Sequence, residues 1–241
     1  MSAELLRVER LSKRFGGFTA LESVDLHLDE GERLGLIGPN GSGKTTMINC
    51  ISGALYNDAG RVRFAGEDIT RLAPFERARR GIARSFQIPK PFRSMTVLEN
   101  LCVPLEYAAR SRTERRRVPE VARALAGRIG LGARAGQNSA SLTQVDMRKL
   151  ELARALAAKP RLLVSDEAMA GLSSSEVDEI LEILFALNRD GVAVIMIEHI
   201  MRAVMRFSQR IVVLDAGRKI CEGSPEAVCK DPEVEKAYLG E

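Results

Sequence analysis

The chain has 241 residues, with 36 Lys and Arg residues against 32 Asp and Glu residues, for a formal net charge of +4. This length suits one large domain or two small ones, and so mild a charge does not by itself imply a nucleic-acid partner. No apolar run approaches the roughly 20 residues that cross a bilayer. The start, MSAELLRVER, carries charges where a signal peptide needs an apolar stretch. We therefore expect a cytosolic protein, which does not prevent docking on a membrane protein.

The cysteines and the one dense basic run do not indicate a site. The four cysteines, none of them in a CxxC pair, are Cys50, Cys102, Cys221 and Cys229. We expect small buried apolar side chains rather than a disulfide framework or a zinc site. The run RSRTERRR at 110–117 is interpreted as a solvated loop or helix face, and contact with lipid headgroups or an acidic partner is the weaker alternative.

The first third of the chain is typical of strands. Residues 24–29 alternate apolar and polar side chains, which suits a strand buried on one face. A turn at 29–32 leads to a more fully buried strand at 33–37, and residues 61–64 look like another short strand.

The middle of the chain, from about Thr70 to Lys159, has a mostly helical pattern that Pro89, Pro91 and Pro104 are expected to break into pieces. The last third returns to strands and helices. Apolar runs at 162–164 and 192–197 suit strands of a parallel sheet covered on both faces.

A helix is predicted over 174–188, between those two runs. Short strands are predicted at 211–214 and 219–221, and helix starts at Ser224-Pro225 and Asp231-Pro232. The pattern indicates an α/β core interrupted by a helical insertion of about ninety residues.

A phosphate-binding loop is the strongest motif. Residues 38–45 match GxxxxGK[ST] after a predicted strand and before a helical stretch at 46–52, which is the context this motif requires. The residues expected to hold a nucleotide are Gly38, Pro39, Asn40, Gly41, Ser42, Gly43, Lys44, Thr45 and Thr46. Lys44 would reach the β- and γ-phosphates and the Thr45 hydroxyl would ligate Mg²⁺.

Two acidic residues follow the predicted strand in RLLVSDE, at 161–167. Asp166 can hold Mg²⁺ through water, and Glu167 can polarise an attacking water. Acidic residues after a strand often only cap the next helix, but the upstream P-loop favours the catalytic interpretation.

His199 follows the apolar run 192–197, and ligands of open α/β sheets bind at the carboxyl ends of strands. A histidine there can bond the γ-phosphate, although a purely structural histidine is an equal alternative. Gln87, in Ser85-Phe86-Gln87, is by itself an ordinary loop residue.

The order of these parts resembles the ATPase subunit of an ATP-binding cassette (ABC) transporter, over the whole chain. The resemblance implies that Phe15 stacks on adenine and that Gln87 lies in the Q-loop, which joins core and helices and ligates Mg²⁺. Asp166 and Glu167 match the magnesium-site aspartate and the catalytic glutamate. His199 matches the switch histidine, and residues 170–173 lie at the D-loop.

Residues 142–146, LTQVD, then occupy the place of the signature motif, usually LSGGQ, which acts in trans on the ATP of a second subunit. Thr143 keeps the hydroxyl, while Gln144 and Val145 replace the two glycines. Val145 is β-branched and poorly suited to positive φ, and it blocks close backbone approach. The following residues, RKLELARAL at 148–156, look like the signature helix.

The resemblance implies one ABC ATPase domain over 1–241. Its α/β, RecA-like P-loop NTPase core with an N-terminal antiparallel β subdomain would comprise 1–87 and 160–241. The α-helical signature subdomain would be inserted at 88–159.

The stretches SDEAMAGLSSSE, VIMIEHIM, RIVVLDAGRKICEGSP and EKAYLG look like the larger ATPase of branched-chain amino-acid uptake systems, whose relatives serve urea and other small amides or acids. The D-loop aspartate is commonly replaced in that group and glycine-poor signatures occur. The resemblance therefore implies an importer ATPase that hydrolyses ATP to ADP and phosphate with Mg²⁺.

The implied partners are a second ATPase subunit, with a heterodimer favoured, two transmembrane permease subunits contacted through about 88–101, and indirectly a periplasmic binding protein. No nucleic acid is expected. The implied location is the cytoplasmic face of the bacterial inner membrane, as a peripheral subunit.

Three alternatives are weaker. A soluble ABC ATPase of translation or DNA repair usually has two cassettes or a long coiled-coil insertion, and this chain has neither. A P-loop kinase or GTPase would not explain RKLELARAL, and no NKxD motif is present. A lipopolysaccharide-export ATPase would keep both glycines of the signature.

Overall fold

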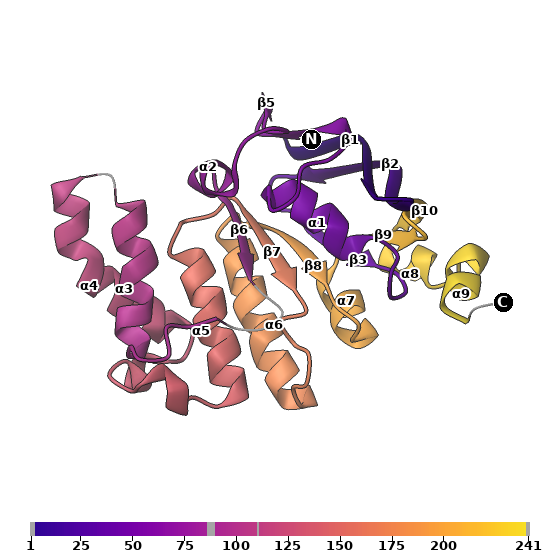
Figure 1. Ribbon diagram of the computed structural model, residues 1–241. Coiled ribbons are helices and arrows are strands. Elements are labelled where there is room, and N and C mark those ends of the chain that lie inside the picture. Colours follow the sequence, from indigo (N-terminus) through magenta and orange to yellow (C-terminus); the bar gives the residue numbers. More distant parts are fainter. Residues whose placement is uncertain (1–2, 86–89, 110, 240–241) are drawn as a thin grey trace.

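The computed structural model describes residues 3–85, 90–109 and 111–239, which form two sheets and a group of helices (Figure 1). The antiparallel sheet has the strand order β2-β1-β4-β5, and the larger sheet has the order β10-β9-β3-β8-β7-β6. Every pairing in the larger sheet is parallel except β9 with β10. Helix α1 lies between the two sheets (Figure 1).

The strands of the antiparallel sheet are β1 (Glu4–Phe15), β2 (Phe18–Asp29), β4 (Ala59–Phe64) and β5 (Glu67–Asp68). The strands of the larger sheet are β3 (Arg33–Ile37), β6 (Ile82–Ser85), β7 (Leu162–Asp166), β8 (Ala193–Ile197), β9 (Arg210–Asp215) and β10 (Arg218–Gly223).

The helices are α1 (Lys44–Ser52), α2 (Pro74–Arg79), α3 (Val97–Ala108), α4 (Arg112–Arg128), α5 (Gln144–Leu156), α6 (Ser174–Arg189), α7 (Met201–Phe207), α8 (Pro225–Val228) and α9 (Pro232–Leu239). Short 3-10 turns occupy Gly132–Arg134 and Ser139–Ser141. Within the described residues, no helix combines the length and the apolar character that crossing a bilayer requires.

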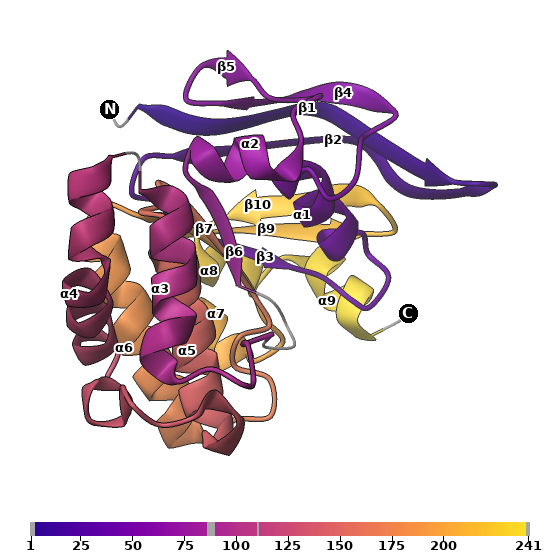
Figure 2. The same ribbon diagram turned by 60° about the vertical axis from the view of Figure 1, so that its left-hand side comes forward.

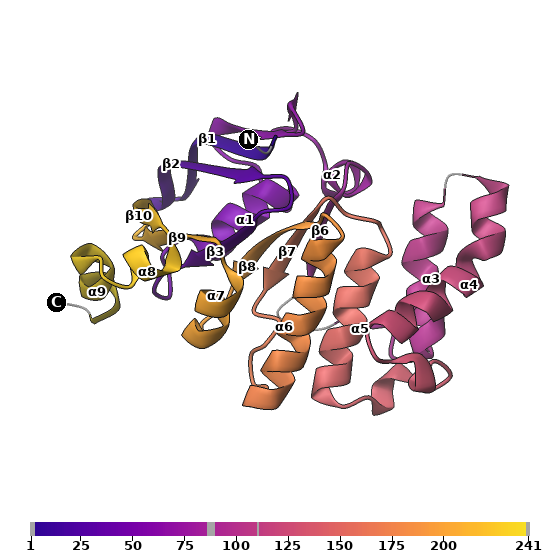
Figure 3. The same cartoon turned by 180° about the vertical axis from the view of Figure 1, so that it is seen from behind.

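Three apolar clusters hold the layers together. Alternate residues of β8 face opposite sides of the sheet: Ile195 packs with α1 and the antiparallel sheet, whereas Val194 packs with α6 and α7. A third cluster joins α3, α4 and α5. Figure 3 shows α5 and α6 side by side, with α3 and α4 beyond them. The burial of β8 on both faces explains its continuous apolar sequence.

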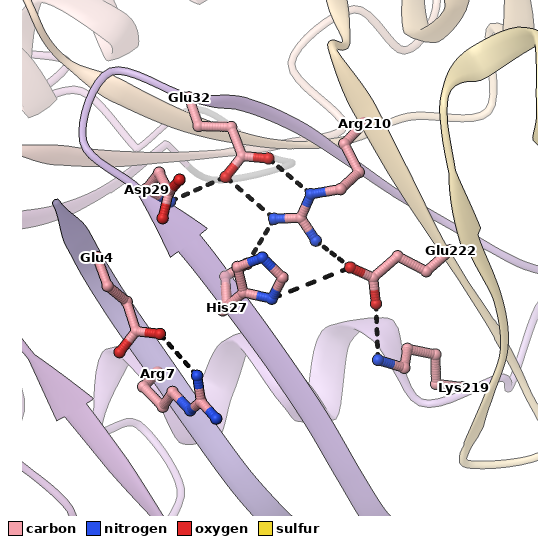
Figure 4. A network of polar contacts seen from close by, with 8 residues as sticks. All are labelled: Glu4, Arg7, His27, Asp29, Glu32, Arg210, Lys219 and Glu222. Carbon is pink, nitrogen blue, oxygen red and sulfur yellow. Dashed lines mark hydrogen bonds and ion pairs between the residues drawn. The ribbon is translucent and has the colours of Figure 1, made fainter. Parts of the chain in front are cut away.

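A charged network joins the antiparallel sheet to the larger one (Figure 4). Arg210 of β9 donates to both carboxylate oxygens of Glu32, at 2.7 and 3.0 Å, and to the carbonyl of His27 in β2, at 2.8 Å. It also pairs with Glu222 of β10. Since His27 belongs to one sheet and Glu222 to the other, the guanidinium fixes their relative position.

The buried side chain of Arg77 in α2 stabilises the end of α1. Its guanidinium donates to the carbonyls of Cys50 and Ile51, at 2.6 and 2.9 Å, and to those of Thr70 and Leu72. Helix α1 ends at Ser52 with carbonyls that lack helical partners, and a cation there also matches the helix dipole.

The predicted architecture is confirmed: an α/β core with an N-terminal antiparallel sheet, and helices α3 to α5 inserted between β6 and β7. The predicted strand at 33–37 and helix at 174–188 match β3 and α6, the latter longer by one residue. The proposed boundary at 87–88 lies outside the described residues.

Two expectations were wrong. Pro104 lies inside α3 rather than ending it, because Leu101 and Leu105 on either side pack into the helical cluster and compensate the lost backbone bond. Of the four cysteines, only Cys50 is buried, while Cys229 is exposed. The edge strand β6 also falls in the region predicted to be mostly helical; its four residues are too few for a clear pattern.

Candidate functional site

Two glycines shape the loop between β3 and α1 by allowing close backbone contacts. Gly38 has φ +147°, and a Cβ there would lie 2.0 Å from the carbonyl oxygen of Leu214 in β9. Gly43 has φ +104°, and its Cβ would lie 2.7 Å from the carbonyl oxygen of Ala20 in β2. The loop is therefore clamped between the two sheets, and only glycine fits at both contacts.

Lys44 begins α1 and points its ammonium back into this loop. Nζ donates to the carbonyls of Gly38 and Pro39, at 2.8 and 2.9 Å. Burial lowers the pKa of Lys44, while the negative charges of Glu167 and Asp166 act in the opposite direction. The ammonium thus lies within the loop, under the electrostatic influence of both acidic side chains.

Asp166 ends β7 and is held by an arginine that the motif search did not find. Arg84 of β6 donates from Nη2 to Asp166 Oδ2 at 2.6 Å, and from Nη1 to Asn49 Oδ1 of α1 at 2.6 Å. The side chains of Arg84 and Asp166 are only 14% and 7% exposed. The Arg84 guanidinium thereby links three elements: β6, which carries it, β7 through Asp166 and α1 through Asn49.

Glu167 follows with a left-handed backbone, φ 48°, and its N–H donates to the carbonyl of Ile197 at the end of β8, at 2.9 Å. An unusual φ of this kind is costly for a side chain with a Cβ and recurs at functional positions. It turns the carboxylate toward His199, whose Nε2 lies 3.2 Å from Glu167 Oε1. The two strand-end residues predicted from the sequence are therefore in direct contact.

Glu198 is a second residue that the motif search missed. Its carboxylate is buried and accepts a hydrogen bond from the Met169 N–H at 2.8 Å. Burial raises the pKa of Glu198 to about 7, with the Glu167 charge acting in the same direction and the Met169 and His199 N–H groups and the Arg148 charge opposing it. Glu198, which directly precedes His199, thereby connects the end of β8 to the loop after Glu167.

Phe15 lines a pocket of about 210 Å³ together with residues of the P-loop. The lining residues are Phe15, Phe18, Ala20, Gly41, Ser42, Gly43, Lys44, Thr45 and Thr46. Both phenylalanine rings are exposed, and an exposed ring can stack on a planar base. Phe18 was not predicted, because a single phenylalanine at a strand start is common.

The Thr45 hydroxyl and the Asp166 carboxylate supply the oxygen ligands that Mg²⁺ prefers, and Thr45 is exposed at the start of α1. Asn40 and Pro39 lie in the loop itself, which ends at Gly43. Gln87, predicted as a third ligand and a catalytic residue, lies outside the described residues.

Thr143 is the N-cap of α5 and belongs to no part of this pocket. Its hydroxyl donates to Asp146 Oδ2 at 2.6 Å and accepts from the Asp146 N–H at 3.3 Å. Gln144 donates from Nε2 to the carbonyl of Ala170, in the segment predicted as the D-loop, at 3.2 Å. The Thr143 hydroxyl and the Gln144 side-chain amide thus both have hydrogen-bond partners within this chain.

One argument about Val145 was wrong. The helix already begins at Gln144, and neither Gln144 nor Val145 has a positive φ. A β-branched residue therefore causes no backbone strain here. Val145 is half-buried and packs against the cluster around α6. Its obstruction of close approach by a second molecule remains a prediction.

The chain is similar over its whole length to known transport ATP-binding proteins. A family model described as ABC transporter matches residues 21–170, and one described as branched-chain amino acid ATP-binding cassette transporter matches residues 218–241. The chain is 36% identical over 255 residues to the high-affinity branched-chain amino acid transport ATP-binding protein BraF of Pseudomonas aeruginosa, with 100% of each covered. It is 38% identical over 255 residues to the corresponding protein LivG of Salmonella typhimurium, again with 100% of each covered.

Solved structures of ATP-binding cassettes also resemble this chain. The chain resembles a nucleotide-free ATP-binding cassette from an ABC transporter, with a TM-score of 0.89 and 34% identity over 99% of this chain and 100% of that chain. It resembles the ADP conformation of such a cassette with a TM-score of 0.90 and 33% identity over 100% of each. The chain therefore belongs to the ABC transporter family, as one of its ATP-binding cassettes.

Proposed function

We propose that the chain is the ATP-hydrolysing subunit that powers an ABC importer for branched-chain amino acids or related small amino acids and amides. The match of residues 218–241 to the branched-chain family model carries this proposal. Full-length relatives named as branched-chain amino acid transport ATP-binding proteins support it.

In this proposal the P-loop and Lys44 bind the phosphates of ATP, and Phe15 stacks on the adenine. Thr45, Gln87 and, through water, Asp166 hold Mg²⁺, which would neutralise charge on the phosphates. The support is chemical: the Lys44 ammonium lies among the loop carbonyls, and the oxygens of Thr45 and Asp166 suit this metal.

Glu167 acts as the general base in the hydrolysis step. A water oxygen attacks the γ-phosphorus, the bond between that phosphorus and the ADP oxygen breaks, and a water proton passes toward Glu167. His199, which lies beside Glu167, hydrogen-bonds the γ-phosphate in this proposal. The 3.2 Å separation of His199 Nε2 and Glu167 Oε1 supports a shared task for this pair.

The proposed assembly is a head-to-tail pair of ATPase subunits in which Thr143 and Val145 close over the ATP of the partner. The exposed N-terminus of α5 suits a phosphate, and a related cassette of 26% identity and TM-score 0.83 has been solved as a dimer with ADP and phosphate. A heterodimer is favoured, because in it this chain's Glu167 faces an intact signature while the partner's ATP faces Val145.

Val145→Gly tests that asymmetry. Removing the side chain opens the approach to the α5 N-terminus, so hydrolysis at the partner's site should change more than hydrolysis at this chain's own site. Val145→Ala is the matched control, because it keeps Cβ and loses only the outer methyl groups. Equal loss of turnover when the catalytic glutamate of either subunit is replaced by glutamine would refute the asymmetry.

Two permease subunits, contacted through about 88–101, would place the chain on the cytoplasmic face of the bacterial inner membrane, with a periplasmic binding protein as indirect partner and no nucleic acid. Within that segment, Phe92 is exposed while Asn100 donates to its carbonyl at 3.1 Å. An exposed aromatic on a loop fixed by a buried amide suits a contact with another subunit.

Reconstitution in vesicles tests the proposal directly. The chain would be combined with its partner ATPase, permeases and binding protein, and uptake of leucine, isoleucine, valine and urea would be measured with ATP inside. We expect ATP-dependent uptake of at least one branched-chain amino acid. Uptake of none of these solutes by an assembly that hydrolyses ATP would contradict the proposed substrate class.

A further inference from the structure

The loop that follows Glu167 is in contact with the helical insertion. It runs from the end of β7 to the start of α6, and α5 and α6 lie side by side (Figure 2). The carbonyl of Ala170 in this loop accepts hydrogen bonds from two side chains of α5, from Gln144 Nε2 at 3.2 Å and from Arg148 Nη2 at 3.4 Å. Because positions i and i+4 share one face of a helix, this face of α5 holds the loop.

The neighbouring residue, Gly171, leaves the space that the Gln144 amide occupies. Gly171 has φ +77°, and a Cβ there would lie 2.8 Å from Gln144 Nε2, closer than Cβ atoms come to other atoms. A side chain at position 171 would therefore displace the amide from the Ala170 carbonyl. The missing Cβ at 171 and the reach of the glutamine at 144 are thus complementary.

The other side of the loop is bonded to the end of β8. The Met169 N–H donates to the buried Glu198 carboxylate at 2.8 Å. The Glu167 N–H donates to the carbonyl of Ile197 at 2.9 Å, and the Ala170 N–H donates to the carbonyl of Glu167 at 3.3 Å. Ala170 is therefore bonded directly to the backbone of Glu167, so the position of Ala170 helps to fix the direction of the Glu167 carboxylate.

The hydrogen bond between Gln144 and Ala170 can be removed without disturbing the core. The Gln144 side chain is exposed. The apolar packing of the loop depends on other residues, since Val145 and Leu172 pack against the buried cluster that contains Met169. Substitution of Gln144 therefore changes the loop and leaves this cluster in place.

We propose that Gln144 is a positioning residue for ATP hydrolysis at this chain's own site, where it holds Ala170 and thereby the loop that carries Glu167. This role rests on the proposed function of Glu167 as the general base. It differs from the role proposed for the neighbours Thr143 and Val145, which close over the ATP of the partner. The start of α5 thus serves both ATP sites of the pair.

Turnover at this chain's own site is isolated by assembling the transporter with a partner ATPase whose catalytic glutamate is replaced by glutamine. Gln144→Met keeps the length of the side chain and removes the donor. We expect turnover to fall by about tenfold, because small errors in the placement of a reacting group are costly, while the dissociation constant of MgATP stays within about twofold.

The matched control is Gln137→Met, because Gln137 lies in the same insertion and donates to Ser141 rather than to Ala170. Its turnover should equal that of the unmodified chain, and Gln144→Lys, which restores a donor, should recover most of the lost turnover. Own-site turnover of Gln144→Met within about twofold of the unmodified chain, or a loss confined to the partner's site, would overturn the proposal. Turnover that survived Glu167→Gln in the same assembly would instead reject Glu167 as the base.

The space at position 171 gives a second test. Gly171→Ala should lower turnover by a smaller factor in the Gln144→Met chain than in the unmodified chain, because the amide is then no longer displaced. Equal factors in the two chains would show that Gln144 does not use this space, which contradicts the proposed contact.

Hydrogen exchange of the full chain alone gives a readout that does not depend on turnover. The Leu172 N–H donates to the carbonyl of Met169 at 3.2 Å within the loop. We expect Gln144→Met to speed exchange of residues 167–173 by roughly fivefold, the effect of one net hydrogen bond on local opening. Exchange as slow in Gln144→Met as in Gln137→Met would overturn the proposal.

Discussion

The buried ion pair between Arg84 and Asp166 should stabilise the fold far more than an exposed pair of the same kind. Arg84→Met removes the guanidinium and keeps most of its aliphatic stem. It leaves the Asp166 carboxylate, only 7% exposed, without this cation, and the Asn49 amide oxygen without this donor. Losing one partner of a buried pair typically costs about 3–5 kcal/mol.

The matched control is Arg80→Met. Arg80 and Glu67 lie 3.0 Å apart, but their side chains are 38% and 66% exposed, and exposed pairs contribute about 0–1 kcal/mol. For a domain of this size, each kcal/mol shifts the melting temperature by roughly 2–4 °C. We therefore expect Arg84→Met to lower it by roughly 6–20 °C and Arg80→Met by less than about 4 °C.

Thermal unfolding would be measured for both variants with ATP and EDTA and then with ATP and Mg²⁺. Because a bound cation would restore a positive charge near Asp166, Mg²⁺ should raise the melting temperature of Arg84→Met more than that of the unmodified chain. Equal and small effects of Arg84→Met and Arg80→Met would refute the reasoning that burial of the pair determines its contribution.

Two further substitutions test the P-loop contact and the buried carboxylate. Gly38→Ala should destabilise the chain by roughly 2 kcal/mol more than Gly41→Ala in urea unfolding, because a Cβ meets Leu214 at the first position and open space at the second; equal costs would contradict this. The pKa of Glu198 is raised from 4.5 to about 7, so its stabilising contribution is complete below pH 4.5 and is lost as the pH rises through 7. Relative to Glu198→Gln, which does not titrate there, the unmodified chain should lose about 3 kcal/mol of unfolding free energy between pH 4.5 and 8, at 1.36 kcal/mol per pKa unit. A pH-independent difference between the two proteins would show that Glu198 does not titrate as its burial implies.

The sequence predicted those parts of the site that depend on local structure. The P-loop is one continuous segment whose glycine positions are set by contacts at Gly38 and Gly43. Asp166 ends β7 and His199 follows β8, and parallel strands bring such ends to one edge of the sheet. The pairing of β7 with β8, from Leu162 with Ala193 to Asp166 with Ile197, does this.

The missed residues depend on register or on tertiary contacts. Arg84 reaches Asp166 only because β6 pairs with β7 in a register that sets Arg84 against Val164, and four residues of β6 gave no periodic pattern. Glu198 belongs to no sequence motif, and only the hydrogen bond from the Met169 N–H and the burial of its carboxylate distinguish it. The positive-φ argument about Val145 failed because the position of a helix N-terminus cannot be fixed to one residue from sequence.

We propose that Glu167 is the base of the ATP-hydrolysing site. This role is tested by measuring ATP binding and turnover of Glu167→Gln in the assembled transporter, side by side with the unmodified chain. We expect MgATP still to bind, because Lys44 and the P-loop are unchanged, while turnover falls by roughly 100-fold or more, the usual contribution of a general base. Turnover within about twofold of the unmodified transporter, with ATP still bound, would contradict it.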